Sequence, residues 1–166
     1  MKPQSFEIIE YQKEYEPLLI SFLKKCLPES HRSLDINGRH SYYLNIAEHF
    51  VGFWCMIDDN NIIGTVAISE LDNKRCELKS LYLLEQYQGK GYGKKMLIYA
   101  INQAKKHGYK EMFLDSLSTS TKAIALYRKV GFNDTDKYNS SVYSDVFMVL
   151  GLYNFDSKGG IEICPR

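Results

Sequence analysis

A short glycine-rich stretch with several lysines is the part of this sequence that most clearly suggests chemistry. Residues 87–93 read YQGKGYG and run directly into KKMLIYAINQAKK, whose apolar spacing predicts a helix. Glycines let backbone amides approach a ligand closely, and a helix start carries the positive end of the helix dipole. Lys90, Lys94 and Lys95 lie where that dipole disfavours cations. The stretch therefore indicates either a binding loop for a polyanion or a flexible turn with solvated lysines.

Two common phosphate-binding glycine motifs do not fit this stretch. The pattern GxxxxGK[ST] requires a second glycine at position 94, which is Lys94, and no Ser or Thr follows to meet magnesium. The dinucleotide pattern GxGxxG fits Gly89 and Gly91 but meets Lys94 at its third glycine. What remains is Gln88-x-x-Gly91-x-Gly93 between a predicted strand and a predicted helix.

The cysteines and histidines suggest no second reactive centre. His31 and His40 lie in a polar loop and are interpreted as solvated, with no assigned role. A nucleophilic role for Cys76 is less favoured than a buried strand thiol. The four cysteines are far apart and form no CxxC pair, so the sequence predicts reduced thiols and no metal site: Cys26, Cys55, Cys76 and Cys164.

The first half of the chain predicts a strand, two helices and a three-stranded meander. Phe6 and Ile8 alternate in a short strand, and a helix from about Pro17 is stopped by Pro28. Its apolar face is expected to hold Leu18, Leu19, Phe22, Leu23 and Cys26. SYYLNIAEHF predicts a second helix. Three strand-like runs follow, separated by the turn sequences DDNN and DNK: FWCMI, IIGTVAISEL and CELKSLYLL.

After the meander the pattern changes to strand, glycine loop, helix and strand. The helix after the glycine loop ends at Gly108, and EMFLDS is expected to run parallel to CELKSLYLL because a helix connects them. A further helix in STSTKAIALYRKVGF ends at Gly131, and two strands follow around NDTDKY and SDVFMVL. The apolar faces of the two helices comprise Leu97, Ala100, Ile101 and Ala104 in the first and Ala123, Leu126, Tyr127 and Val130 in the second.

Length, composition and charge restrict the class of protein. With 166 residues, 45% apolar and 25% charged, the chain is expected to form one domain, residues 1–166, with a core from about 5 to 152 and an unassigned tail, 153–166. No signal peptide or run of about 18 apolar residues is present, which predicts a cytoplasmic protein. Lys plus Arg (21) nearly balance Asp plus Glu (20), so no overall field favours nucleic acid or a membrane surface.

Residues 76–132 resemble the GNAT superfamily of acyl-CoA-dependent N-acetyltransferases. The resemblance rests on the Q-x-x-G-x-G signature at Gln88, Gly91 and Gly93, and on the block A-I-x-L-Y-x-K-x-G-F that spans residues 123–132. The preceding order of strands and helices extends it to most of the chain. It implies an α/β (mixed α+β) fold, a three-layer αβα sandwich around a mixed, mostly antiparallel sheet of six to seven strands with one parallel pair.

The same resemblance implies acetyl-CoA as co-substrate and no metal. Loop amides of the family cradle the CoA pyrophosphate, and a bulged fourth strand leaves backbone groups free to pair with the pantetheine arm. The cofactor-binding residues implied here are Leu81, Tyr82, Leu83, Gln88, Gly89, Lys90, Gly91, Tyr92, Gly93, Lys94, Ser120 and Ala123. Two departures are notable. Ser120 replaces a frequent Asn and could cap the helix or meet the pantetheine, and Gln88 replaces the commoner Arg.

Two side chains match the family's catalytic positions. Tyr127 matches a helix tyrosine that can protonate the departing CoA thiolate, although its spacing alone favours a core aromatic. Glu77 matches a strand glutamate that several members use as the base for the acceptor amine; as a bare sequence feature it is a solvated strand carboxylate.

The acceptor is less well defined by the sequence. The resemblance places it against ESHRSLDINGRH and KYNSSVYSDVF, which would include Tyr138, Asn139 and Tyr143. A small-molecule amine is the expected acceptor, while amino acids, polyamines, aminoglycosides and peptide amines stay open. Neither a nucleic-acid nor a membrane partner is expected, and monomer or homodimer is undetermined. Two other functions remain: a CoA-sensing or partner-binding module without turnover, and nucleic-acid binding through the lysine cluster.

Overall fold

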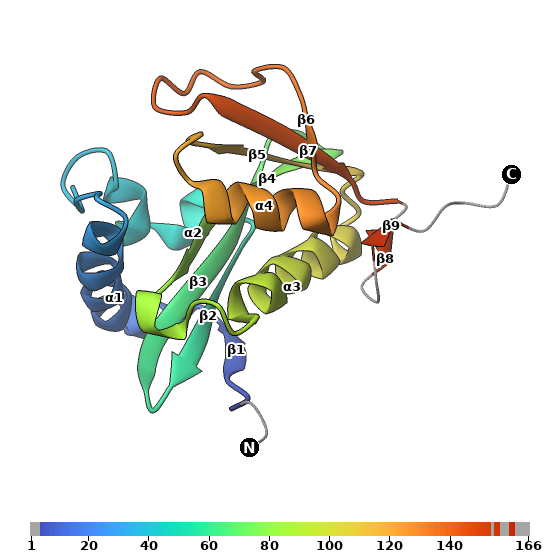
Figure 1. Cartoon of the computed structure of the whole chain (residues 1–166). Coiled ribbons are helices and arrows are strands. Elements are labelled where there is room, and N and C mark those ends of the chain that lie inside the picture. The colour runs from blue at the N-terminus through green and yellow to red at the C-terminus, as the bar shows by residue number, and fades with distance from the viewer. Residues whose placement is uncertain (1–3, 154, 157–159, 162–166) are drawn as a thin grey trace, which may run out of the picture. The chain divides into compact units, whose positions relative to one another are not determined.

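A seven-stranded sheet is the main element of the structure. The computed structural model describes residues 4–153, 155–156 and 160–161 (Figure 1). The strand order is β1-β2-β3-β4-β5-β7-β6. β4 and β5 pair in parallel, and the pairs β1–β2, β2–β3, β5–β7 and β6–β7 are antiparallel. The strands are β1 Glu7–Glu10, β2 Gly52–Asp58, β3 Asn61–Glu70, β4 Arg75–Leu83, β5 Glu111–Ser116, β6 Asn133–Asp134 and β7 Val146–Gly151. The predicted mixed, mostly antiparallel sheet with one parallel pair is confirmed.

The helices and 3-10 turns follow the predicted order. They are η1 Lys13–Tyr15, α1 Glu16–Glu29, η2 Ser41–Leu44, α2 Ile46–His49, η3 Glu85–Tyr87, α3 Tyr92–Lys106 and α4 Thr121–Val130. The tail, which the sequence left unassigned, contains two short paired strands, β8 Phe155–Asp156 and β9 Gly160–Ile161. Cys164 lies outside the described residues.

Backbone proximity divides the chain into two compact units. The first unit comprises Met1–Ser69 and Lys79–Leu97, and the second comprises Glu70–Leu78 and Ile98–Arg166. The boundaries fall inside β3, β4 and α3, so these three elements contribute residues to both units. The single-domain organisation expected from the sequence stays a prediction.

In the first unit, β1, β2 and β3 run side by side (Figure 1). β2 is buried from Gly52 to Met56, and β3 from Ile62 to Ile68. α1 buries Leu19, Phe22, Leu23, Cys26 and Leu27. Leu18 was expected on this face but is 37% exposed, because the buried stripe is rotated toward Leu27. Pro28 lies in the last turn and the helix ends one residue later, close to the predicted stop.

The second predicted helix is wrong in detail. SYYLNIAEHF forms a 3-10 turn and a single α-turn, because Asn45 adopts φ −137° and interrupts the helical backbone. The segment is fixed by aromatic packing: Tyr43 is 1% exposed and its ring lies 4.5 Å from the Tyr42 ring and 6.4 Å from the Phe50 ring. Burial of these rings outweighs the helical pattern of the sequence.

In the second unit, β5 pairs with β4 on one side and β7 on the other. α4 buries Ile124, Tyr127 and Val130, while Ala123 and Leu126, which were expected on the same face, are only half-buried. Gly131 ends the helix at φ +122°, and the Phe132 amide donates to the Tyr127 carbonyl oxygen at 3.0 Å. The predicted apolar face of α3 is buried throughout.

Candidate functional site

The glycine loop, residues 88–93, follows η3 in the first unit and leads into α3. Gly89 and Gly91 have φ values of +77° and +88°, a region that side-chain-bearing residues rarely adopt. A Cβ atom built at either glycine would meet nothing within 4 Å. The backbone at this loop therefore faces open space. The glycines are required by the backbone angles and not by crowding.

The amides at the start of α3 are available for an anion. The Lys95 amide donates to the Gly91 carbonyl oxygen at 3.0 Å, which opens the helical series. The amides before Lys95 therefore precede the intrahelical bonds and lie at the positive end of the helix dipole. This geometry suits a phosphate group, which is one of the two alternatives that the sequence left open.

Several side chains of the loop are occupied by the fold. The Gln88 amide nitrogen donates to the Leu83 carbonyl oxygen at 2.9 Å. Tyr92 is buried against Phe6 with ring centroids 5.0 Å apart, and its hydroxyl donates to the Gln4 carbonyl oxygen at 2.7 Å. Gln88 and Tyr92 can therefore serve a ligand mainly through backbone atoms.

The three lysines of this region are not equivalent. Lys95 donates to the Phe6 carbonyl oxygen at 2.9 Å, which ties α3 to the segment before β1. Lys90 and Lys94 are exposed. Lys95 is exposed as well, so all three lysines lie at the surface. Lys90 and Lys94 are the two that were predicted as cofactor-binding residues.

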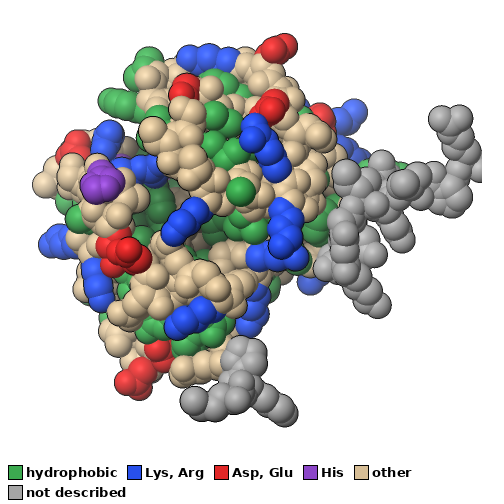
Figure 2. All heavy atoms as spheres, in the orientation of Figure 1, with side chains coloured by type: hydrophobic (Ala, Val, Ile, Leu, Met, Phe, Trp, Pro, Cys, Tyr) green, Lys and Arg blue, Asp and Glu red, His purple; other side chains and the backbone are tan. Residues whose placement is uncertain are grey.

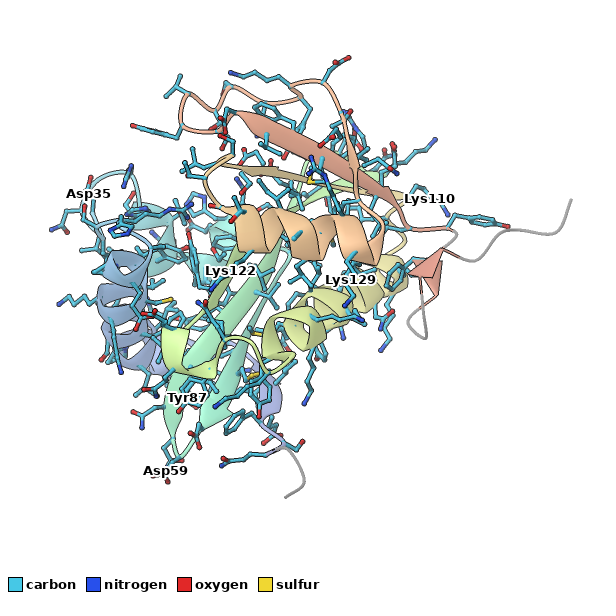
Figure 3. The ribbon with its side chains drawn as sticks, in the orientation of Figure 1. Asp35, Asp59, Tyr87, Lys110, Lys122 and Lys129 are labelled. Atoms are coloured by element: carbon cyan, nitrogen blue, oxygen red, sulfur yellow. The ribbon has the colours of Figure 1, made fainter. Side chains whose placement is uncertain are left out.

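The turn before the loop is fastened to the meander. Tyr87 belongs to η3, and its hydroxyl donates to a carboxylate oxygen of Asp58 at 2.7 Å. Figure 3 shows Tyr87 near the β2–β3 turn that carries Asp59. In addition, the Glu85 amide donates to a carboxylate oxygen of Glu29 in α1 at 2.8 Å. These anchors hold the entry to the loop while its glycines stay open to solvent.

A group of polar side chains lies in the second unit, around Glu77 of β4. Glu77 is 5% exposed, and its Oε2 accepts hydrogen bonds from the Tyr138 hydroxyl at 2.5 Å and the Asn139 amide nitrogen at 3.1 Å. The same Asn139 nitrogen donates to Asp115 at the end of β5, at 2.5 Å. We call Glu77, Asp115, Tyr138 and Asn139 the carboxylate cluster.

Aromatic packing fixes the carboxylate cluster. The Tyr138 ring lies 4.8 Å from the Phe113 ring and 5.9 Å from the Phe147 ring. Burial, and then the adjacent Glu77 carboxylate, raise the pKa of Tyr138 above its usual value of 10.0. Tyr138 is therefore a neutral hydroxyl donor across the ordinary pH range. Glu77, described from the sequence alone as a solvated carboxylate, is instead buried and hydrogen-bonded.

Tyr127, Ser120 and Ala123 lie on or beside α4. Tyr127 is 8% exposed and packs against Phe132 with ring centroids 5.8 Å apart. Ser120 precedes the helix without a side-chain capping bond, so capping, one of its two expected roles, is wrong. Figure 3 shows Lys122 and Lys129 projecting from one side of α4, and both are exposed.

The structure also describes the cysteines and the histidine to which the sequence assigned no role. Cys76 is fully buried, and burial raises the pKa of its thiol to about 12, which makes it a poor nucleophile. Cys26 and Cys55 are likewise buried free thiols. His40 accepts a bond from the Asp35 amide at 2.9 Å, and burial lowers its pKa. Asp115 was not identified from the sequence, although a carboxylate near the end of an otherwise apolar strand was the available signal.

Within the residues that the structure describes, no three His, Cys, Asp or Glu side chains are grouped as metal ligands. Over the same residues, none of the helices has the length and apolar character that a membrane crossing requires. Figure 2 shows Lys and Arg side chains in separate patches with acidic side chains also present on this face. The picture does not favour a continuous basic surface for nucleic acid on the side shown.

Comparison with known proteins gives one consistent family. Residues 12–132 match the acetyltransferase (GNAT) family model. An uncharacterised N-acetyltransferase of Escherichia coli is 32% identical over 87 residues, which cover 51% of this chain and 52% of the relative. The chain thus spans about half the length of that relative. A [ribosomal protein bS18]-alanine N-acetyltransferase of Haemophilus influenzae is 32% identical over 130 residues, 78% of this chain and 80% of the relative.

A solved structure shows the same fold. The PaiA N-acetyltransferase of Thermoplasma acidophilum, in complex with coenzyme A, has a TM-score of 0.72 and 24% sequence identity. The aligned region covers 89% of this chain and 99% of that one.

Proposed function

Because the chain belongs to the acetyltransferase (GNAT) family, we propose that it transfers an acetyl group from acetyl-CoA to a primary amine. The observation that carries the proposal is the glycine loop. Gly89 and Gly91 adopt positive φ, face open space and lie directly before the amides of α3. That combination suits the binding of a pyrophosphate.

Acetyl-CoA would contact the residues implied by the resemblance. The amides of residues 88–94 would bind the pyrophosphate, and Lys90 and Lys94 would offset its charge. The backbone of Leu81–Leu83, at the end of β4, would pair with the pantetheine arm. All three of these side chains are half-buried. Ser120 and Ala123 at the start of α4 would complete the set, and the Ser120 hydroxyl is not used in a helix cap.

The reaction forms an amide bond and breaks a thioester bond. The amine nitrogen attacks the acetyl carbonyl carbon, the carbon–sulfur bond breaks, and CoA leaves as a thiolate. The nitrogen loses a proton, which Glu77 would accept, and the thiolate gains one, which Tyr127 would supply and later recover from solvent. Tyr138 and Asn139 hold the Glu77 carboxylate in one orientation through Oε2.

The acceptor is proposed to be a small-molecule amine that contacts the segment carrying Tyr138, Asn139 and Tyr143. Tyr143 is 66% exposed and can meet an incoming molecule. The relative from Haemophilus influenzae is named for an alanine of a ribosomal protein, so a peptide α-amine is the rival acceptor.

The first experiment is a binding test. Acetyl-CoA at about 100 times its dissociation constant should stabilise the fold by about 2.7 kcal/mol, or about 5 to 11 °C in melting temperature. The second measures release of the CoA thiol with a panel of small amines and an alanine-starting peptide. No shift at millimolar acetyl-CoA would refute the proposal. A shift without thiol release from any amine would favour a CoA-binding module that lacks turnover.

A further inference from the structure

Ser80, in β4, has a backbone conformation that its residue type disfavours. Its φ is +52°, in the left-handed region, and it is one of four described non-glycine residues with positive φ. The other three, His31, Asp59 and Asn60, lie in turns or loops. An L-residue in this region within a strand costs free energy and persists only where its surroundings enforce it.

The hydrogen bonds along β3 and β4 show why the backbone deviates at Ser80. The Leu71 amide donates to the Arg75 carbonyl oxygen at 2.9 Å, and the Leu84 amide donates to the Ile63 carbonyl oxygen at 3.0 Å. On the β3 side, Leu71 lies eight positions after Ile63. On the β4 side, Leu84 lies nine positions after Arg75. β4 therefore carries one extra residue between these bonds, which defines a β-bulge, and Ser80 is the residue with bulge-like angles.

Two buried side chains form hydrogen bonds to Ser80, one to its side chain and one to its backbone. The Thr65 hydroxyl donates to the Ser80 carbonyl oxygen at 2.7 Å, and the Tyr43 hydroxyl is hydrogen-bonded to Ser80 Oγ, also at 2.7 Å. Thr65 is fully buried and Tyr43 is 1% exposed. Neither hydroxyl has access to solvent, so each contributes its bond in a fixed direction. We call Tyr43 and Thr65 the clamp.

We propose that Tyr43 and Thr65 are positioning residues that keep Ser80 in the left-handed conformation and thereby aim the backbone of Leu81–Leu83 at the pantetheine arm of acetyl-CoA. The inference rests on the proposed function for the identity of the ligand. Its structural premise is independent of that function, because it rests on the φ of Ser80 and on the two hydrogen bonds to Ser80, whose residues all lie in the first unit.

A close approach on β3 supports the same assignment. A Cβ atom at Gly64 would lie 3.1 Å from the Tyr82 carbonyl oxygen and 2.8 Å from the Met96 methyl carbon. The absent side chain at Gly64 lets β4 approach β3 immediately after the bulge. The backbone after the bulge is thus constrained by the close approach of Gly64 at Tyr82 and by the clamp at Ser80.

The test begins with Tyr43→Phe, which removes only the hydroxyl. Without the Tyr43 hydroxyl only the Thr65 half of the clamp remains, and Ser80 should relax more readily toward negative φ. The dissociation constant for CoA, measured by calorimetry, and the KM for acetyl-CoA should both rise about fivefold or more, the population penalty of an L-residue in this region. kcat at saturating acetyl-CoA should change little. A merely structural role would lower the melting temperature and the active fraction without changing KM.

Two second-site variants separate backbone conformation from hydrogen bonding. Ser80→Gly in the Tyr43→Phe background should restore CoA affinity toward that of wild type, because glycine adopts positive φ readily. Ser80→Ala in the same background should not restore CoA affinity, although it removes the same hydroxyl. Thr65→Val should weaken CoA binding, and Thr65→Ser, which keeps the donor, should weaken it less.

The outcomes are distinguishable from failure of the proposed function. If wild type does not bind CoA, the function is refuted. If wild type binds CoA and Tyr43→Phe binds it equally well, the clamp has no positioning role. If Ser80→Gly and Ser80→Ala rescue Tyr43→Phe equally, an unpaired hydroxyl explains the loss and the inference is overturned.

Discussion

Tyr138→Phe tests whether the carboxylate cluster has the arrangement described. The substitution keeps the ring between Phe113 and Phe147 but removes the donor that lies 2.5 Å from Glu77 Oε2. A hydrogen bond to a charged group contributes about 1.5 to 3 kcal/mol. The free energy of unfolding at pH 7 should therefore fall by about that amount, or about 3 to 12 °C in melting temperature. Urea denaturation measures the change in the free energy of unfolding.

Tyr11→Phe is the matched control. The Tyr11 hydroxyl is buried and has no hydrogen-bond partner among the described residues. Removing an unpaired buried hydroxyl should leave stability at pH 7 unchanged or raise it. Burial raises the pKa of Tyr11 to about 12, so it also shares the alkaline behaviour of Tyr138.

The pH dependence gives a second readout for Tyr138. Burial and Glu77 raise its pKa in the folded state, so above about pH 10 the unfolded chain loses a proton that the folded protein keeps. The stabilisation that the neutral Tyr138 hydroxyl contributes is then lost as pH rises. By pH 11 the wild type should have lost up to about 1.4 kcal/mol through this residue, less to the extent that solvent screens this half-buried side chain. Tyr138→Phe escapes that loss, so its deficit should shrink by the same amount. A deficit that stays constant from pH 7 to pH 11 would refute the reasoning.

Four further predictions concern the proposed chemistry. Gly91→Ala should weaken CoA binding in calorimetry, whereas Gly108→Ala, which is equally open at φ +86°, should carry the same backbone strain, about 1 kcal/mol, without that loss. Tyr127→Phe should lower kcat by about 10² to 10⁴ with little change in acetyl-CoA affinity, and activity like that of wild type would return Tyr127 to a packing role. Glu77→Gln should cost most at low pH in a pH–rate profile, because few amines are then unprotonated; a pH-independent deficit would make Glu77 a positioning residue. Cys76→Ala should keep turnover in the thiol-release assay, and loss of turnover in a folded variant would revive an acyl-enzyme.

The order of elements was predictable because it depends on local patterns. β5 was predicted as EMFLDS and has those bounds, since an apolar run between a helix stop and a polar loop has few alternatives. α3 and its end at Lys106, two residues before Gly108, follow from apolar periodicity and a glycine at positive φ.

The features that the sequence missed depend on tertiary contacts. The helical pattern of SYYLNIAEHF is interrupted at Asn45 because Tyr43 is buried among other rings. Asp115 and Asn139 meet across 24 positions of sequence, and no local pattern reports such a contact. The conformation of Ser80 is equally invisible, because serine gives no signal of positive φ.

The burial of Glu77 is itself evidence on function. Its neighbours in β4, Cys76 and Leu78, are buried apolar side chains, and an apolar residue at 77 would need no partner. A buried carboxylate costs free energy that its hydrogen bonds only offset, so such groups are weak evidence of stability. Here Tyr138 supplies one donor to Glu77, and Asn139 supplies another while also bonding Asp115. An arrangement that uses this many polar groups to keep one carboxylate in place is poorly explained by packing, and it fits a side chain whose charge takes part in the reaction.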